Sequence, residues 1–98
     1  QSFRCVGKGN YHHGAPDVTE RWIVADDTRT GTITLLDTET GENHLLLTGL
    51  KPSGGYEHCH PSFNRAGDSV LLTLPRPGKG VQVGVIDLRQ VGPWSVNI

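Results

Sequence analysis

The sequence predicts an all-β fold built from many short strands. Apolar residues come in short runs, and almost no segment has the 3.6-residue period of an amphipathic helix. Turn-forming residues separate these runs, and the chain contains 13 Gly and 6 Pro. The hydrophobic share of 35% is that of a folded chain rather than a disordered one.

The apolar runs fall into two similar groups along the chain. In the first group, polar turns that end in glycine separate the runs, and Asp26 and Asp27 at one such corner are expected to be solvated or to cap the turn. A loop rich in glycine follows the first group and separates it from the second. We expect strands at residues 22–25, 32–36 and 44–48 in the first group and at 61–63, 69–74 and 81–88 in the second.

The two groups also match each other in detail. Superposing residues 21–24 on residues 69–72 gives an offset of 48 positions, and the same offset places His12 on His60. Repeats of about 40–50 residues made of short antiparallel strands are typical of β-propeller blades. The sequence therefore predicts two four-stranded antiparallel blades within a partial β-propeller domain, residues 1–98. The first blade covers residues 11–55 and the second, incomplete, covers 56–98. The alternative is a small β-sandwich whose halves are alike by chance.

A molecule of only two blades would leave large apolar faces in water. We therefore expect the missing blades to come from the rest of a longer chain or from an assembly. The absence of methionine, even at position 1, agrees with a piece of a longer chain. No stretch has the pattern of a signal peptide, which favours a cytoplasmic location.

Charge and hydropathy exclude two classes of partner. The net charge of −1 and a pI near 6.6 leave no basic stripe for nucleic acid. No apolar run approaches the roughly 20 residues of a membrane helix. Cys5 and Cys59 lack zinc-type spacing; they are expected as two ordinary thiols, with a single disulfide as the alternative.

Four of the five histidines precede the expected inner strands of the two repeats. His12 and His13 do so in the first repeat, and His58 and His60 in the second. In an extended segment, residues two apart point to the same side, so His58 and His60 can face one point. Inner strands line the channel of a propeller, where a histidine of the neighbouring blade would join them. Three imidazoles suit a divalent transition metal such as Mn, Fe or Zn. The alternative to a metal site is that these histidines form a polar surface. His44 receives no role.

Several segments of the chain resemble a known family. The resemblance is to blades of the oligogalacturonate lyases, polysaccharide lyases related to the TolB-like propellers, and it covers most of residues 11–89. Its histidines make it specific, because the other blade motifs are common to many propellers. The matching segments are His13–Asp17 followed by Arg21–Asp27, His58–Asn64 running into Gly67 and Asp68, and the strand endings Leu35–Gly41 and Val85–Leu88.

The resemblance implies a seven-bladed ring and a manganese-type ion held by three histidines and one glutamine. The pair His58 and His60 matches the His-x-His element of the family, and the upstream ligand is His13, or His12 if the register slips by one. The place of the glutamine is taken by Gly55, which has no side chain to bind a metal. The family's catalytic base and its substrate-binding arginine belong to earlier blades, so no residue here is assigned a catalytic role.

The implied reaction is the cleavage of oligogalacturonides, which derive from pectin, by β-elimination. The metal binds the sugar carboxylate as a Lewis acid, a histidine base removes the C5 proton, and the glycosidic bond at C4 breaks without water. This chain would supply the metal-binding portion of such a carbon–oxygen lyase. The alternative is a non-catalytic propeller piece that binds a partner or a sugar, which Gly55 favours. Whether the chain is an enzyme stays open at this point.

Overall fold

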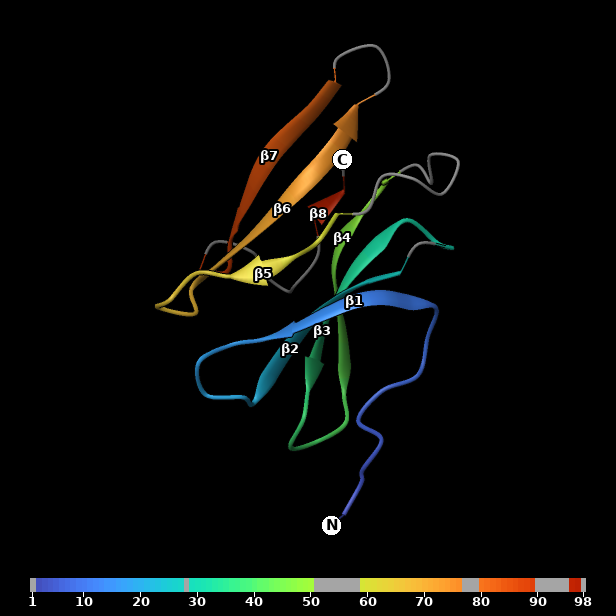
Figure 1. The fold of residues 1–98 in the computed structure, drawn as a ribbon, viewed down its shortest axis with the longest axis vertical. Helices are drawn as coiled ribbons and strands as arrows, with labels where there is room; N and C mark the ends of the chain where they lie inside the picture. Colours follow the sequence, from blue (N-terminus) through green and yellow to red (C-terminus); the bar gives the residue numbers. More distant parts are fainter. Residues whose placement is uncertain (1, 28, 51–58, 77–79, 90–95, 98) are drawn as a thin grey trace.

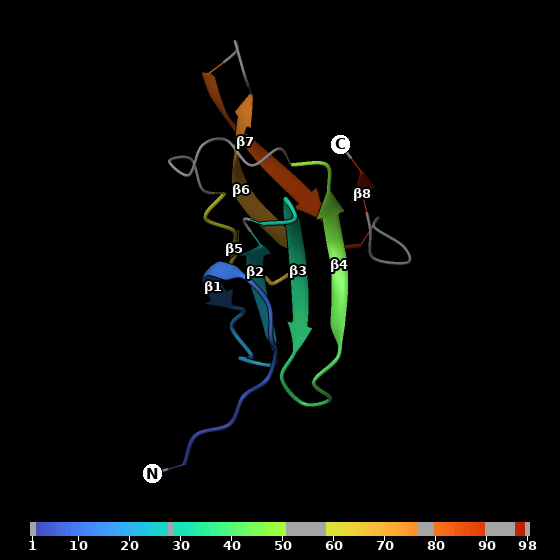
Figure 2. The ribbon, with the colours of Figure 1, turned by 90° about the vertical axis from the view of Figure 1, so that its right-hand side faces the viewer.

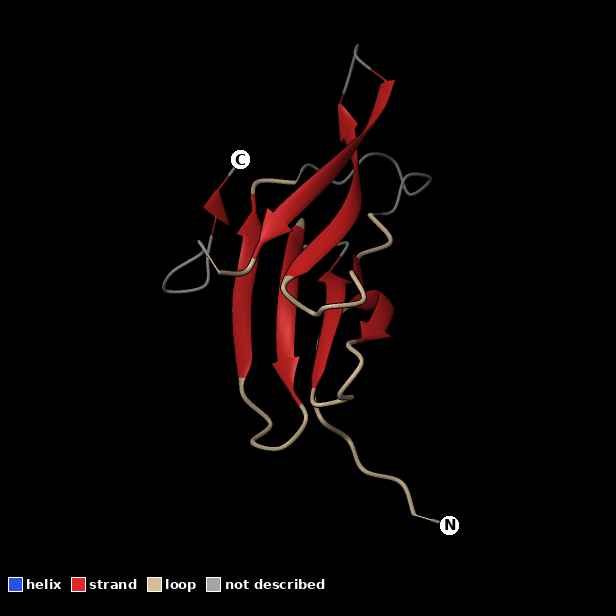
Figure 3. Cartoon of the chain, turned by 90° about the vertical axis from the view of Figure 1, so that its left-hand side faces the viewer, coloured by secondary structure: helices blue, strands red, loops and turns tan. Residues whose placement is uncertain are grey.

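The computed structural model of the chain describes residues 2–27, 29–50, 59–76, 80–89 and 96–97. Within these ranges the chain forms eight β-strands and no helix, as the cartoon in Figure 3 shows. The predicted all-β class is therefore confirmed for this part of the chain. It follows that no described segment forms an apolar helix long enough to cross a membrane.

The first sheet has four consecutive antiparallel strands and one short parallel addition. Its order is β1-β2-β3-β4-β8, and β8 pairs in parallel with β4 (Figures 1 and 2). The antiparallel strands pair with their neighbours in sequence, as short turns dictate. The strands are β1 (Tyr11–Pro16), β2 (Trp22–Asp27), β3 (Thr32–Asp37), β4 (Asn43–Thr48) and β8 (Val96–Asn97).

The second sheet is an antiparallel sheet of three described strands. They are β5 (Ser62–Phe63), β6 (Ser69–Arg76) and β7 (Gly80–Asp87), in the order β5-β6-β7. The β6–β7 hairpin extends beyond the first sheet in Figure 1. All six predicted strands thus correspond to observed ones, whereas β1, for which no strand is predicted, forms by pairing with β2.

The core lies between the two sheets. Val24 and Leu35, which are directly paired in the first sheet, belong to one buried cluster with Val70 and Leu72 of the second. Trp22 is half-buried and packs against this cluster. Side chains of β6 point alternately toward the core and away from it. The face of the second sheet that points away from the core is exposed, and it carries Leu71, Val83 and Val85.

The two sheets repeat the same hydrogen bonds at the turn before their second strand. In the first sheet, the Asp17 N–H donates to the Trp22 carbonyl (2.8 Å), and the Trp22 N–H donates to Oδ1 of Asp17 (3.2 Å). In the second, the Asn64 N–H donates to the Ser69 carbonyl (3.0 Å), and the Ser69 N–H donates to Oδ1 of Asn64 (3.1 Å). An aspartate and an asparagine therefore close equivalent turns through the same atoms.

These equivalent turns correct the predicted repeat offset. Asp17 corresponds to Asn64, which is 47 positions further on, whereas the sequence comparison suggested 48. The sequence comparison aligned two short apolar runs. Such runs still match when one of them is shifted by one residue, so they do not determine the offset to a single position. With the observed offset, His13 rather than His12 takes the position equivalent to His60.

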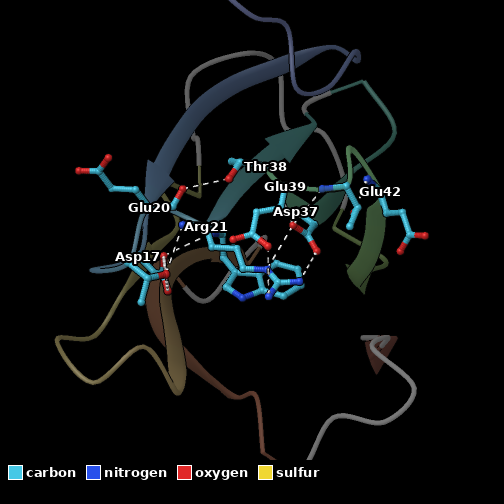
Figure 4. Close-up of polar contacts among 10 residues, drawn as sticks. Asp17, Glu20, Arg21, Asp37, Thr38, Glu39 and Glu42 are labelled. Atoms are coloured by element: carbon cyan, nitrogen blue, oxygen red, sulfur yellow. Dashed lines mark hydrogen bonds and ion pairs between the residues drawn. The ribbon is translucent and has the colours of Figure 1, made fainter.

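The repeat continues at the ends of β3 and β7. Asp37 accepts the Glu39 N–H (2.9 Å), and Asp87 accepts the Arg89 N–H (2.9 Å). Each carboxylate is also bound by the guanidinium of an arginine, Arg21 for Asp37 and Arg89 for Asp87. Figure 4 shows the first of these corners, with Asp37 between Arg21 and the turn that follows.

The two corners differ in burial. The side chain of Asp37 is 4% exposed, whereas that of Asp87 is 27% exposed. Hydrogen bonds from Arg21 lower the pKa of Asp37 from 3.8 to about 2. Because this folded-state pKa lies below the unfolded one, the ionised Asp37 stabilises the fold above about pH 4, and that contribution is lost as the pH falls toward 2.

We expect Asp37→Asn to lower the thermal unfolding midpoint by about twice as much as Asp87→Asn, or more, because exposed ion pairs contribute little. The midpoint can be followed by circular dichroism at neutral pH and near pH 2. The difference between the wild type and Asp37→Asn should be largest at neutral pH and shrink in acid. Equal effects of the two substitutions at neutral pH would contradict this expectation.

Candidate functional site

A β-bulge in β1 presents two neighbouring histidines to the same place. The pairing of β1 with β2 shifts between Tyr11 and Gly14, so that β1 has one residue more than β2 in this interval. His12 and His13 consequently lie opposite a single residue of β2, Asp26. Bulges of this kind change the direction of side chains that regular alternation would send to opposite faces. The bulge thus brings both histidines opposite Asp26.

The carboxylate of Asp26 binds His13 at two points. Its Oδ1 accepts the backbone N–H of His13 at 2.6 Å, and its Oδ2 lies 3.4 Å from the ring Nδ1. Asp26 is 3% exposed, and the side chain of His13 is half-buried. An ionised carboxylate only accepts hydrogen bonds, so the ring Nδ1 can bond to this oxygen only as a donor.

His60 joins the cluster from the segment that precedes β5. The carbonyl of Cys59 accepts the N–H of Thr73 (2.8 Å) and its hydroxyl (3.2 Å), which ties this segment to β6. The His60 ring centroid lies 3.9 Å from that of His13, with 40° between the planes. The ring of His12 contacts His13 edge-on, with 4.6 Å between the centroids.

The backbone of His60 differs from the sequence prediction. His60 has φ +44°, a left-handed conformation that is uncommon for a residue other than glycine. The assumption of an extended segment through His60 is therefore wrong. The reason is that the chain has to turn from its bond with Thr73 into β5.

The structure brings together part of the predicted ligand set. His13 and His60, from the two repeats, are in contact, whereas His58 and Gly55 lie outside the described residues. Among the residues that are described, no group of three or more His, Cys, Asp or Glu has the arrangement of a metal site. His44 lies on β4 beside Trp22, with 6.0 Å between the ring centroids.

The cluster contains donor types that the metal implied by the family resemblance takes, although the described residues alone form no complete metal-binding group. Neutral imidazole is a common ligand of divalent transition metals. Metal-binding histidines commonly donate their other ring N–H to a carboxylate, and Asp26 is placed to accept that of His13. Of the predicted ligands, the described residues bring together His13 of β1 and His60, which precedes β5; the predicted third is His58.

Asp26 is the residue of the site that sequence reasoning missed. Asp27 caps the turn as expected, accepting the N–H groups of Arg29 (3.0 Å) and Thr30 (3.1 Å). Asp26, in contrast, is buried against His13 and is not solvated. The available signal was its alternation with Val24, a buried residue two positions earlier on the same strand.

The thiol of Cys59 lies close to this carboxylate. Burial raises the pKa of Cys59 to about 11, and the negative charge of Asp26 contributes to the shift. The sulfur is therefore a neutral thiol at neutral pH and a poor metal ligand. Cys5 is exposed and Cys59 is buried, and both are free, so the disulfide alternative is not realised.

An open hollow adjoins the histidine cluster on the second sheet. Its volume is about 140 Å³, and His60 forms part of its wall. The other lining residues are Ser62, Leu71, Leu72, Thr73 and Val83.

Comparisons of the chain with protein-family models, with curated proteins and with solved structures found no match.

Proposed function

We propose that His13 and His60, together with His58, hold a divalent transition metal, with manganese as the first candidate. We further propose that the chain is the metal-site portion of a β-propeller enzyme of the oligogalacturonate-lyase type, which cleaves galacturonate oligomers by β-elimination. The observation that carries this proposal is the contact of the His13 and His60 rings, 3.9 Å apart, at equivalent positions of two repeats.

The repeated hydrogen bonds support the propeller part of the proposal. Equivalent turn and strand-end contacts in two stacked antiparallel sheets are what successive blades of a propeller would have. The exposed apolar face with Leu71, Val83 and Val85 is the surface that a further blade would cover. The blade limits at residues 11–55 and 56–98 belong to this proposal.

The residues of this chain would hold and orient the metal rather than move a proton. Asp26 fixes the His13 ring, and the bond from Thr73 to the Cys59 carbonyl fixes the backbone before His60. A bound metal would act as a Lewis acid toward a sugar carboxylate. Three protein ligands, with Gly55 adding none, would leave coordination positions for that carboxylate.

A manganese titration of the full chain tests the metal site. We expect the wild type to bind Mn²⁺, and His13→Gln and His60→Asn to lose at least about tenfold in affinity. Asparagine is chosen at position 60 because it tolerates the left-handed backbone. His44→Gln, outside the cluster, is the matched control and should bind as the wild type does. The free and bound ion can be measured by electron paramagnetic resonance.

Equal manganese affinity in all four proteins, or no binding by the wild type, would refute the metal assignment. Circular dichroism spectra of the variants establish that each one is folded. Loss of binding in His44→Gln together with the two cluster variants would also refute it, because that side chain is outside the cluster.

The substrate class is tested separately, by calorimetry on the manganese-loaded chain. Trigalacturonate should bind, and the neutral trisaccharide of galactose, which lacks the carboxylates, should bind at least about tenfold more weakly. A chelator should abolish the difference. Equal binding of the two sugars would overturn the lyase-type function while leaving the metal site intact.

A further inference from the structure

Asp26 is a buried carboxylate whose two oxygens both face the same residue. Its Oδ1 holds the backbone N–H of His13 (2.6 Å), and its Oδ2 faces Nδ1 of the same histidine (3.4 Å). Burying an ionised group is costly unless hydrogen bonds compensate it, and His13 supplies them here. One carboxylate therefore contacts both the backbone N–H and the ring of His13. The backbone of the bulge and the orientation of this ring consequently depend on each other.

The bulge makes this double contact possible. In a regular antiparallel pair, backbone N–H groups point along the sheet and side chains stand away from it. The extra residue in β1 breaks the ladder opposite Asp26, so the N–H of His13 is directed to a side chain instead of a strand carbonyl. The same carboxylate then reaches the ring of His13.

We propose that Asp26 is a positioning residue that selects the tautomer of His13. By accepting from Nδ1, it keeps the proton on that atom and leaves the lone pair on Nε2. The ring of His60 packs against this imidazole and limits its rotation. The selection of the tautomer is inferred from the contact of Asp26 with Nδ1 of His13; its use, with Nε2 binding the metal, rests on the proposed function.

The substitution Asp26→Asn gives a sharp test because an amide keeps the shape and changes one atom. In the variant, the backbone N–H of His13 still needs an acceptor, so the oxygen of the asparagine amide must take the place of Oδ1. Its NH₂ group then faces Nδ1 and donates to it, which forces the ring proton onto Nε2. The variant should therefore reverse the tautomer of His13 with little change in packing.

The tautomer can be read in the metal-free, ¹⁵N-labelled chain by long-range ¹H–¹⁵N correlation spectra. The pH should lie about 1.5 units above the usual histidine pKa of about 6.5, so that the rings are neutral. We expect Nδ1–H in the wild type and Nε2–H in Asp26→Asn. The control is Asp27→Asn, whose side chain caps the turn, and it should keep the wild-type tautomer. With Mn²⁺ added, Asp26→Asn should bind about 10–100-fold more weakly than Asp27→Asn.

The outcomes separate this inference from the proposed function. An Nε2–H tautomer in the wild type would overturn the role of Asp26 even if the variant failed to fold. An unchanged tautomer in Asp26→Asn would overturn it as well. An unchanged manganese affinity after the tautomer reverses would overturn only the use of that tautomer in metal binding. A reversed tautomer in a chain that binds no manganese would support the selection of the tautomer by Asp26 and refute the proposed metal site.

Discussion

Gly31→Ala should destabilise the chain more than Gly41→Ala, a substitution at another left-handed glycine of the described residues. Gly31 has φ +70°, and a Cβ atom there would overlap the carbonyl oxygen of Leu50. The carbonyl of Gly31 also accepts the Leu50 N–H at 3.1 Å, so the two backbones cannot separate without losing that bond. A left-handed alanine costs about 1–2 kcal/mol by itself, and the overlap adds about 1–3 kcal/mol.

Gly41→Ala is the matched control for this prediction. Gly41 has φ +79°, and no atom lies near the position of an added Cβ. It should therefore show only the conformational cost of about 1–2 kcal/mol. Urea unfolding of the two variants measures the difference in free energy. Equal losses of unfolding free energy in the two variants would mean that the backbones at Gly31 and Leu50 move apart without an energetic penalty.

Leu46→Ala is the second change for which we expect a large effect. Leu46 is fully buried and belongs to the cluster between the two sheets. Truncating a buried leucine removes apolar contacts and leaves a cavity, which costs about 2–5 kcal/mol. This is a large share of the about 5–15 kcal/mol that stabilises a typical domain. We expect a clearly lower urea midpoint, measured by circular dichroism.

The neighbouring Leu45 provides the control on the same strand. Leu45 is 44% exposed, so Leu45→Ala should cost less than about 1 kcal/mol. Both substitutions remove the same atoms from adjacent residues with the same strand propensity. If the two variants lost the same stability, the assignment of Leu46 to the core and Leu45 to the surface would be wrong.

The predicted strands were found because their signals are local. Runs such as Ile23–Ala25 and Leu71–Leu74 combine apolar and β-branched residues with turn formers at their ends, and both features act over a few residues. β1 could not be found in this way. Its sequence contains two histidines, a glycine and a proline, and it becomes a strand because β2 offers an edge for it to pair with.

The candidate site was predictable in its residue types and not in its geometry. The histidines before each repeat indicated that His13 and His60 could meet, and their rings are in contact. The bulge that aligns His12 and His13, and the left-handed backbone of His60, depend on pairing between strands distant in sequence. The role of Asp26 depends on the same bulge.

The sequence by itself determined that this chain is made of β-strands in two similar halves, with histidines at corresponding places. Such properties follow from local periodicity and turn chemistry. Only the tertiary structure decided the repeat offset of 47 positions and the partner of each imidazole. A one-residue bulge changes the direction of every contact near it, and its position is settled by hydrogen bonds between strands rather than by the residues of either strand alone.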